Sequence, residues 1–123
     1  MIIIAGVNDV YQGRPAEHVT GQLRAMYDRA AAAGIPVIAG TIVPYNTATP
    51  EQNAKMHAIN AWIRAEAGRD PNITFADTRA AAARDDNQDM LRGSPDGLHP
   101  DIDGYRRMAA VLAAALSNVN RKS

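Results

Sequence analysis

Three short apolar runs, separated by segments with helical periodicity, most strongly constrain the fold of this chain. Ile2 to Ala5, Val37 to Ile42 and Ile73 to Ala76 are rich in β-branched residues and do not alternate with polar ones. Such runs are typical of strands that are buried on both faces of a sheet. Because a helical segment follows each run, the order predicts an α/β fold with three layers, α/β/α, around a parallel sheet.

The segments between the runs carry the start and stop signals of helices. Pro15 begins the first helix, and Gly34 with Pro36 ends it. Residues 49–52, Thr-Pro-Glu-Gln, match a capping box at the start of the second helix. Residues 77–92 are expected to form a short helix and a polar loop, and Asp101 is expected to cap the last helix. The side chains predicted to face inward from the three long helices are Val19, Leu23, Met26, Tyr27, Ala30, Met56, Ile59, Ile63, Tyr105, Met108, Ala109, Leu112 and Leu116.

Size and charge exclude several classes of protein. The 123 residues fit a single domain, 1–123. The net charge is zero, so the field that binds a phosphate backbone is missing and nucleic acid is not an expected partner. The absence of cysteine excludes disulfides and thiolate metal sites. No apolar run approaches the ~20 residues of a membrane span, and both a cytoplasmic and a secreted location stay open.

Polar side chains follow the predicted strands at their carboxyl ends. Asn8 comes after the first run, residues 41–46 follow the second, and Asp77 follows the third. Parallel α/β sheets form their sites at this edge. The side-chain amide of Asn8 can stabilise an oxyanion, and Tyr45 and Asn46 are candidate binding residues.

Asp96 and His99 lie three residues apart in a loop flanked by glycine and proline, which is expected to pass near the same edge. A carboxylate at this spacing can orient an imidazole as a general base. The alternatives are that His99 is a surface or structural histidine, that the pair caps the last helix, and that Asn8 only forms an Asx-turn. Asp9 is interpreted as structural, since a carboxylate beside an oxyanion would oppose catalysis.

The remaining motifs argue against a metal or a cofactor. His18 and His57 lie on predicted helices without a carboxylate or histidine at ligand spacing. No glycine-rich phosphate loop follows any of the predicted strands, so we expect no nucleotide cofactor.

Two of these motifs together resemble blocks of the SGNH hydrolase family, also called the GDSL esterase/lipase family. Residues 6–9, Gly-Val-Asn-Asp, are similar to the family's third block, whose asparagine donates to the oxyanion. Residues 96–100, Asp-Gly-Leu-His-Pro, are similar to its fifth block, which holds the acid and base of a catalytic triad. The resemblance implies a carboxylic ester hydrolase, lipolytic or acting on carbohydrate or aryl esters, with Asp96 orienting His99 and Asn8 in the oxyanion hole.

The family's first block, Gly-Asp-Ser, which supplies the nucleophile, has no counterpart in this sequence. The serines present are Ser94, Ser117 and Ser123. Ser94 lies in the same loop as His99 and lacks the strand-to-helix turn that exposes a nucleophile, so we do not expect it to act as one. The resemblance therefore covers the C-terminal part of the family domain, and the chain is expected to be N-terminally truncated to about three strands.

Two functions are expected from these motifs and from the missing block. The first is a serine-esterase-type chain that acts on a small-molecule ester and has little or no activity by itself. In the family's strand order, 2-1-3-4-5, loss of the first two strands leaves Ile2 to Ala5 as an unprotected edge, and a homodimer through that edge is expected. The alternative is accordingly a non-catalytic oligomeric module derived from the SGNH fold. A flavodoxin-like binding domain is a third interpretation, which the missing phosphate loop disfavours.

Overall fold

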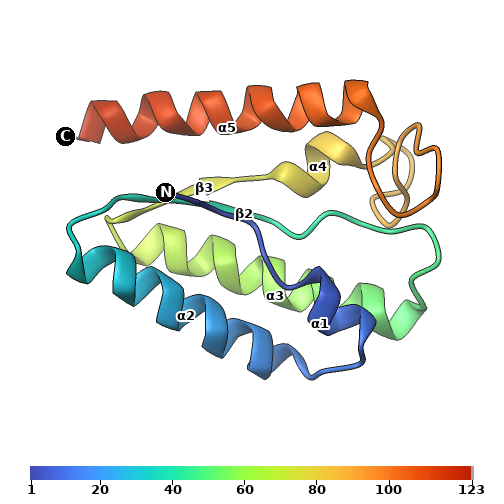
Figure 1. Ribbon diagram of the computed structural model, residues 1–123, viewed down its shortest axis with the longest axis horizontal. Coiled ribbons are helices and arrows are strands. Elements are labelled where there is room, and N and C mark those ends of the chain that lie inside the picture. The colour runs from blue at the N-terminus through green and yellow to red at the C-terminus, as the bar shows by residue number, and fades with distance from the viewer. Residues whose placement is uncertain (123) are drawn as a thin grey trace.

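The computed structural model describes residues 1–122, in which helices separate and follow the strands (Figure 1). The elements in chain order are β1 (Ile2–Ile3), α1 (Val7–Tyr11), α2 (Ala16–Ala32), β2 (Val37–Gly40), α3 (Pro50–Arg69), β3 (Ile73–Ala76), α4 (Thr78–Ala82) and α5 (Ile102–Lys122). Among these helices, none combines the length and apolar character that crossing a bilayer requires.

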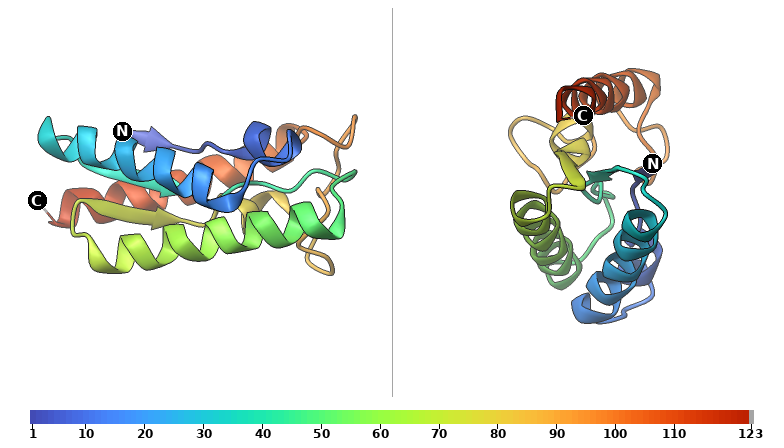
Figure 2. Two further views of the ribbon diagram at one scale, coloured as in Figure 1. Left: turned by 90° about the horizontal axis from the view of Figure 1, so that it is seen from below. Right: turned by 90° about the vertical axis from the view of Figure 1, so that its left-hand side faces the viewer.

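The three strands form one parallel sheet in the order β1-β2-β3. Ile38 of β2 lies opposite Ile2 of β1 on one side and Thr74 of β3 on the other. Helices α2 and α3 cover one face of the sheet, and α5 covers the other with the short α4 beside it (Figure 2). The predicted three-layer α/β/α fold with about three parallel strands is confirmed.

The main core lies between the sheet and helices α2 and α3. The predicted inward residues Met56, Ile59 and Ile63 of α3 are all fully buried. The predicted capping box is formed at Thr49, whose hydroxyl accepts from the Gln52 amide at 3.1 Å while the Gln52 side chain accepts from the Thr49 amide at 2.9 Å. Helix α3 thus starts at the residue that the sequence predicts.

Helix α5 differs from the prediction in the face that it buries. Tyr105 and Leu116, expected to point inward, are about half exposed, and Ala109 is exposed as well. The buried side is centred on Ala115, which packs on Ile38 and Ala76. Val111, Leu112 and Val119 are partly buried around this cluster, so α5 turns a different side to the sheet from the one predicted.

Strand β1 is shorter and more exposed than predicted. It spans only Ile2–Ile3, with Ile2 55% and Ile4 38% exposed. Of the predicted run, Ile3 is buried in the core and Ala5 is partly buried against it. The reason is positional: β1 is the edge strand, and α5 packs over β2 and β3 instead.

A glycine in the middle of α2 offers a simple test of helix energetics. Gly21 is exposed, and a Cβ at this position meets no atom within 4 Å. We expect Gly21→Ala to raise the free energy of unfolding by about 0.5–1 kcal/mol, because alanine loses less backbone entropy on folding. Urea denaturation followed by circular dichroism measures this change. Gly34→Ala, at a φ of +73° just after α2, is the opposing control and should destabilise the protein.

Candidate active site

Helix α1 places Asn8 just beyond the carboxyl end of β1. The turn into the helix is made by Gly6, which has a φ of +119°. The Asn8 side chain is exposed and forms no hydrogen bond within residues 1–122, so the alternative of an Asx-turn is not observed. Asp9 instead turns to Arg14, with 3.5 Å between the carboxylate and Nε, in line with a structural role.

Asp96 and His99 form the hydrogen-bonded pair that their spacing suggests. The Asp96 Oδ2 atom lies 2.7 Å from His99 Nδ1. The other oxygen accepts from the backbone amides of Leu98 at 2.9 Å and His99 at 2.8 Å. The hydrogen bond from the His99 ring, helped by these two amides, holds the pKa of Asp96 well below its ordinary value. With Nδ1–H given to the carboxylate, His99 keeps the Nε2 lone pair available for a proton.

Ser94 forms hydrogen bonds within this loop. Its hydroxyl donates to the His99 carbonyl at 2.6 Å and accepts from the Gly97 amide at 2.8 Å. Both contacts hold the turn around Asp96 and leave the hydroxyl engaged with the backbone. Of the other serines, Ser117 is exposed on α5, and Ser123 lies outside the described residues.

One pocket brings Asn8 and His99 together. It encloses about 410 Å³ and is lined by residues of α1, of the segment after β2 and of the start of α5. These elements lie at the end of the molecule where the loops gather (Figure 1). Apart from the Asn8 amide and the His99 imidazole, its lining is mostly apolar or aromatic. The lining residues are Val7, Asn8, Tyr11, Val43, Tyr45, Leu98, His99, Pro100, Tyr105 and Met108. Such an apolar cleft with a few convergent polar groups is the usual form of a small-molecule site.

The two predicted binding residues have different positions. Tyr45 lines the pocket, is 2% exposed, and lies against the ring of Tyr11, with 5.8 Å between the centroids. Burial raises the pKa of the Tyr45 hydroxyl. Asn46 is not among the lining residues, and its side chain accepts a hydrogen bond from the Leu91 amide at 2.8 Å.

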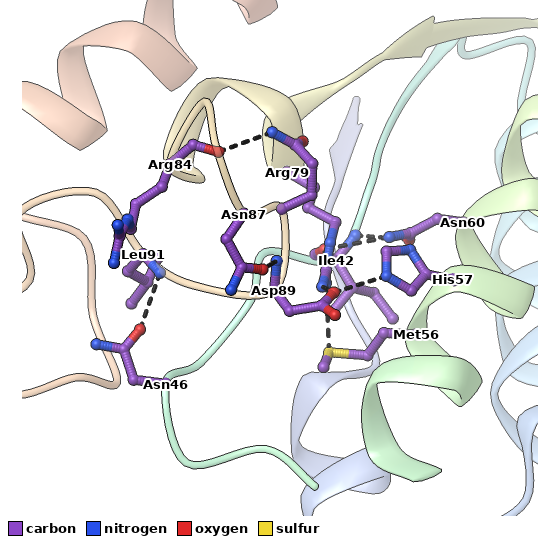
Figure 3. Close-up of polar contacts among 11 residues, drawn as sticks. Ile42, Asn46, Met56, His57, Asn60, Arg79, Arg84, Asn87, Asp89 and Leu91 are labelled. Carbon is purple, nitrogen blue, oxygen red and sulfur yellow. Dashed lines mark hydrogen bonds and ion pairs between the residues drawn. The ribbon is translucent and has the colours of Figure 1, made fainter. Parts of the chain in front are cut away.

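A second polar cluster lies beside this region, and sequence reasoning missed it. Arg79 is only 4% exposed, and its Nη2 donates to Asp89 Oδ1 at 2.9 Å (Figure 3). The same oxygen lies 2.7 Å from His57 Nε2, so the carboxylate partner that His57 lacks in the sequence comes from 32 residues away. A separation of this kind leaves no local sequence signal. Within the described part of the chain, no group of three acidic, histidine or cysteine side chains is placed to hold a metal ion.

The lowered pKa of Asp96 predicts a pH-dependent stability. In the folded state the Asp96 carboxylate stays charged at a pH where the same aspartate in the unfolded chain, with a pKa of about 3.9, is already protonated. The stabilisation is therefore complete above this value and is lost as the pH falls toward the folded-state pKa. We expect Asp96→Asn to lower the melting temperature at pH 6, and the difference from the original protein to shrink toward pH 2. Thermal denaturation at several pH values measures this, and a constant difference would contradict it.

Comparison with known proteins agrees with this geometry. A family model described as the GDSL-like lipase/acylhydrolase family matches residues 1–107. A GDSL-like lipase from Bacteroides thetaiotaomicron is 26% identical with a TM-score of 0.83, covering 95% of this chain and 61% of that one. A carbohydrate esterase family 3 protein from Talaromyces cellulolyticus is 28% identical with a TM-score of 0.74, covering 99% of this chain and 58% of that one.

A variant of an acetyl esterase solved with an acetate ion is 27% identical with a TM-score of 0.72, covering 99% of this chain and 59% of that one. The chain thus spans about three fifths of the length of these solved proteins. No curated protein matches the sequence. Because the family model covers most of its length and solved members share its fold, the chain belongs to the GDSL-like lipase/acylhydrolase family.

Proposed function

We propose that this chain carries the acid, the base and an oxyanion donor of a carboxylic ester hydrolase. The observation that supports this most is that the Asn8 amide and the His99 imidazole line one pocket, with Asp96 bonded to the far side of the imidazole. In this proposal His99 Nε2 removes a proton from the attacking oxygen, and Asn8 donates to the oxygen that becomes negative. The proton then passes from His99 to the departing alcohol.

The described serines are not placed to act as the nucleophile of this reaction. Among the described residues, the Ser94 hydroxyl is engaged by the backbone and Ser117 lies on the exposed side of α5. We therefore propose that the chain alone acts slowly, with water attacking the ester carbonyl under general-base assistance from His99. Such assistance is worth roughly 10²–10⁴-fold.

The substrate class follows from the pocket and from the similar solved proteins. A mostly apolar cavity of about 410 Å³ suits a small ester. Since two of the similar structures are a carbohydrate esterase and an acetyl esterase, we propose acetyl esters of carbohydrate or aryl alcohols as the first substrates to test.

Hydrolysis of p-nitrophenyl acetate by purified protein tests the proposal. We expect a slow rate above that of buffer, and His99→Ala should lower it by about a hundredfold or more because the base is lost. Asn8→Ala should lower it by about tenfold or more, since oxyanion donors typically contribute 10²–10³ in complete enzymes.

His18→Ala is the matched control, because His18 lies on α2 beside Arg14 and does not line the pocket. Its rate should equal that of the original protein. A His99→Ala variant that keeps the full rate would overturn the assignment. Labelling of the chain by a serine-reactive fluorophosphonate, with loss of turnover, would contradict water as the nucleophile.

The second candidate is a non-catalytic module that assembles as a homodimer, and the exposed edge of the sheet favours it. Within residues 1–122, strand β1 pairs only with β2, and Ile2 and Ile4 next to its free edge are 55% and 38% exposed. Free strand edges with apolar side chains are templates for pairing. Sedimentation at micromolar concentration distinguishes the cases. A dimer that persists in the Ile2→Lys variant would show that β1 is not part of the interface. A stable monomer would exclude the oligomeric module.

A further inference from the structure

Asn46 connects three segments that are far apart in the sequence. Its backbone amide donates to the Gly97 carbonyl at 2.7 Å, next to Asp96. Its side-chain oxygen accepts from the amide of the buried Leu91 at 2.8 Å (Figure 3). Gly97, at a φ of +74°, faces the Asn46 side chain, and an added Cβ would be in ordinary van der Waals contact with Asn46 Cβ at 3.4 Å. The loop that carries His99 therefore contacts Asn46 through Gly97.

The partner at residue 91 is itself held in place. Leu91 pairs with Ala83 in an antiparallel bridge, and the Arg92 amide donates to the Ala82 carbonyl at 3.0 Å. Two residues before Leu91, Asp89 binds both Arg79 and His57. Segment 83–92 is thus fixed to α4 by its backbone and to α3 by His57.

Arg79 links this segment to the one that contains Asn46. Its Nη1 donates to the Ile42 carbonyl at 3.2 Å, while Nη2 donates to Asp89 (Figure 3). The Asn60 amide group binds the N–H of Ile42 at 2.8 Å and its C=O at 3.2 Å. Hydrogen bonds therefore fix both the segment that leads to Asn46, at Ile42, and the partner of its side chain, at Leu91.

We propose that Asn46 is a positioning residue, which sets where the Asp96–His99 loop lies relative to helix α1 and its Asn8. The contact between Asp96 and His99 is local and forms within the loop, so it does not by itself place the imidazole over the pocket. The hydrogen bonds of Asn46 join this loop, through Gly97, and Leu91 to the segment that follows β2. The catalytic meaning of this position rests on the proposed function, but the position of the loop can be measured independently of any activity.

The absence of cysteine allows a direct measurement of loop position. A nitroxide attached to Gln12→Cys, exposed just after α1, broadens backbone amide signals according to their distance from the label. Asn46→Ala removes the acceptor for the Leu91 amide, and we expect the broadening of the Gly97 and His99 amide signals to change. Asn46→Asp keeps an oxygen at the same place and should restore the original pattern.

Hydrogen exchange supplies a second readout in the same variants. In Asn46→Ala, the amide of residue 46 should exchange about tenfold faster, the opening expected when a contact of ~1.4 kcal/mol is lost. The His99 amide, which donates to Asp96 within the loop, should stay protected, because the loop moves as a unit. Asn72→Ala is the matched control: it loses one asparagine-to-backbone bond, to Ile35, at the other end of the sheet. It should leave both readouts unchanged.

The outcomes decide the proposal. Unchanged broadening in Asn46→Ala overturns it, as does an Asn46→Asp variant that fails to restore the pattern. If Asn46→Ala does not fold, Asn46→Ser, whose hydroxyl is too short to reach Leu91, takes its place under the same criteria. A moved loop combined with hydrolysis that does not depend on His99 would support the positioning role and reject the proposed function.

Discussion

Replacing Arg79 by methionine should lower the free energy of unfolding by about 3 kcal/mol. Arg79 is 4% exposed, and its guanidinium donates to the Ile42 carbonyl and to Asp89. Burial lowers the pKa of Arg79, against the opposing effect of Asp89, but arginine stays protonated in proteins. Methionine fills much of the same volume beside Met56, so the loss reports mainly the polar contacts to Asp89 and to the Ile42 carbonyl, which keeps Asn60 as a donor.

Arg84→Met is the control for this prediction. Arg84 forms a two-point ion pair with Asp86, at 2.9 and 2.8 Å, but both side chains are exposed. Exposed pairs of this kind contribute at most about 1 kcal/mol. Urea denaturation followed by circular dichroism compares the two variants. Equal losses would show that the buried network around Arg79 stabilises the fold no more than a surface pair does.

Replacing Gly6 by alanine should cost a similar amount, about 3 kcal/mol, and should also displace Asn8. The φ of +119° is a conformation that residues with a Cβ rarely adopt. In addition, the new Cβ would lie 2.6 Å from Val19 Cγ1 and 3.1 Å from Ile42 Cδ1, both buried in the core. Backbone strain and overpacking therefore add at the turn that leads into α1.

Gly13→Ala separates these two causes. Gly13 also has a positive φ, +83°, but an added Cβ meets nothing within 4 Å. We expect a loss of only about 1 kcal/mol from backbone strain. If both variants lose the same stability, contact with Val19 contributes nothing. If Gly6→Ala is as stable as the original protein, the tight turn at Gly6 does not constrain α1.

The fold could be predicted well because its signals are local and repeat along the chain. The apolar runs, the capping box at Thr49 and the Asp101 carboxylate, which accepts from the Gly104 amide at 2.7 Å, each act within a few residues. The burial of β1 and α5 could not be predicted in the same way. Periodicity shows that a helix has an apolar side, but the exposure of Tyr105 and Ile2 depends on which strand the helix covers.

The candidate site also contains contacts that the local sequence predicts and contacts that only the tertiary structure forms. The sequence by itself determined the contact between Asp96 and His99, because residues three apart in a tight turn meet without help from the rest of the chain. Only the tertiary structure brought Asn8 to the same pocket, turned Asn46 toward Leu91 and joined His57 to Asp89. The physical reason is range: short-range contacts follow from spacing and turn geometry, whereas contacts across 30 to 90 residues exist only once the layers have packed.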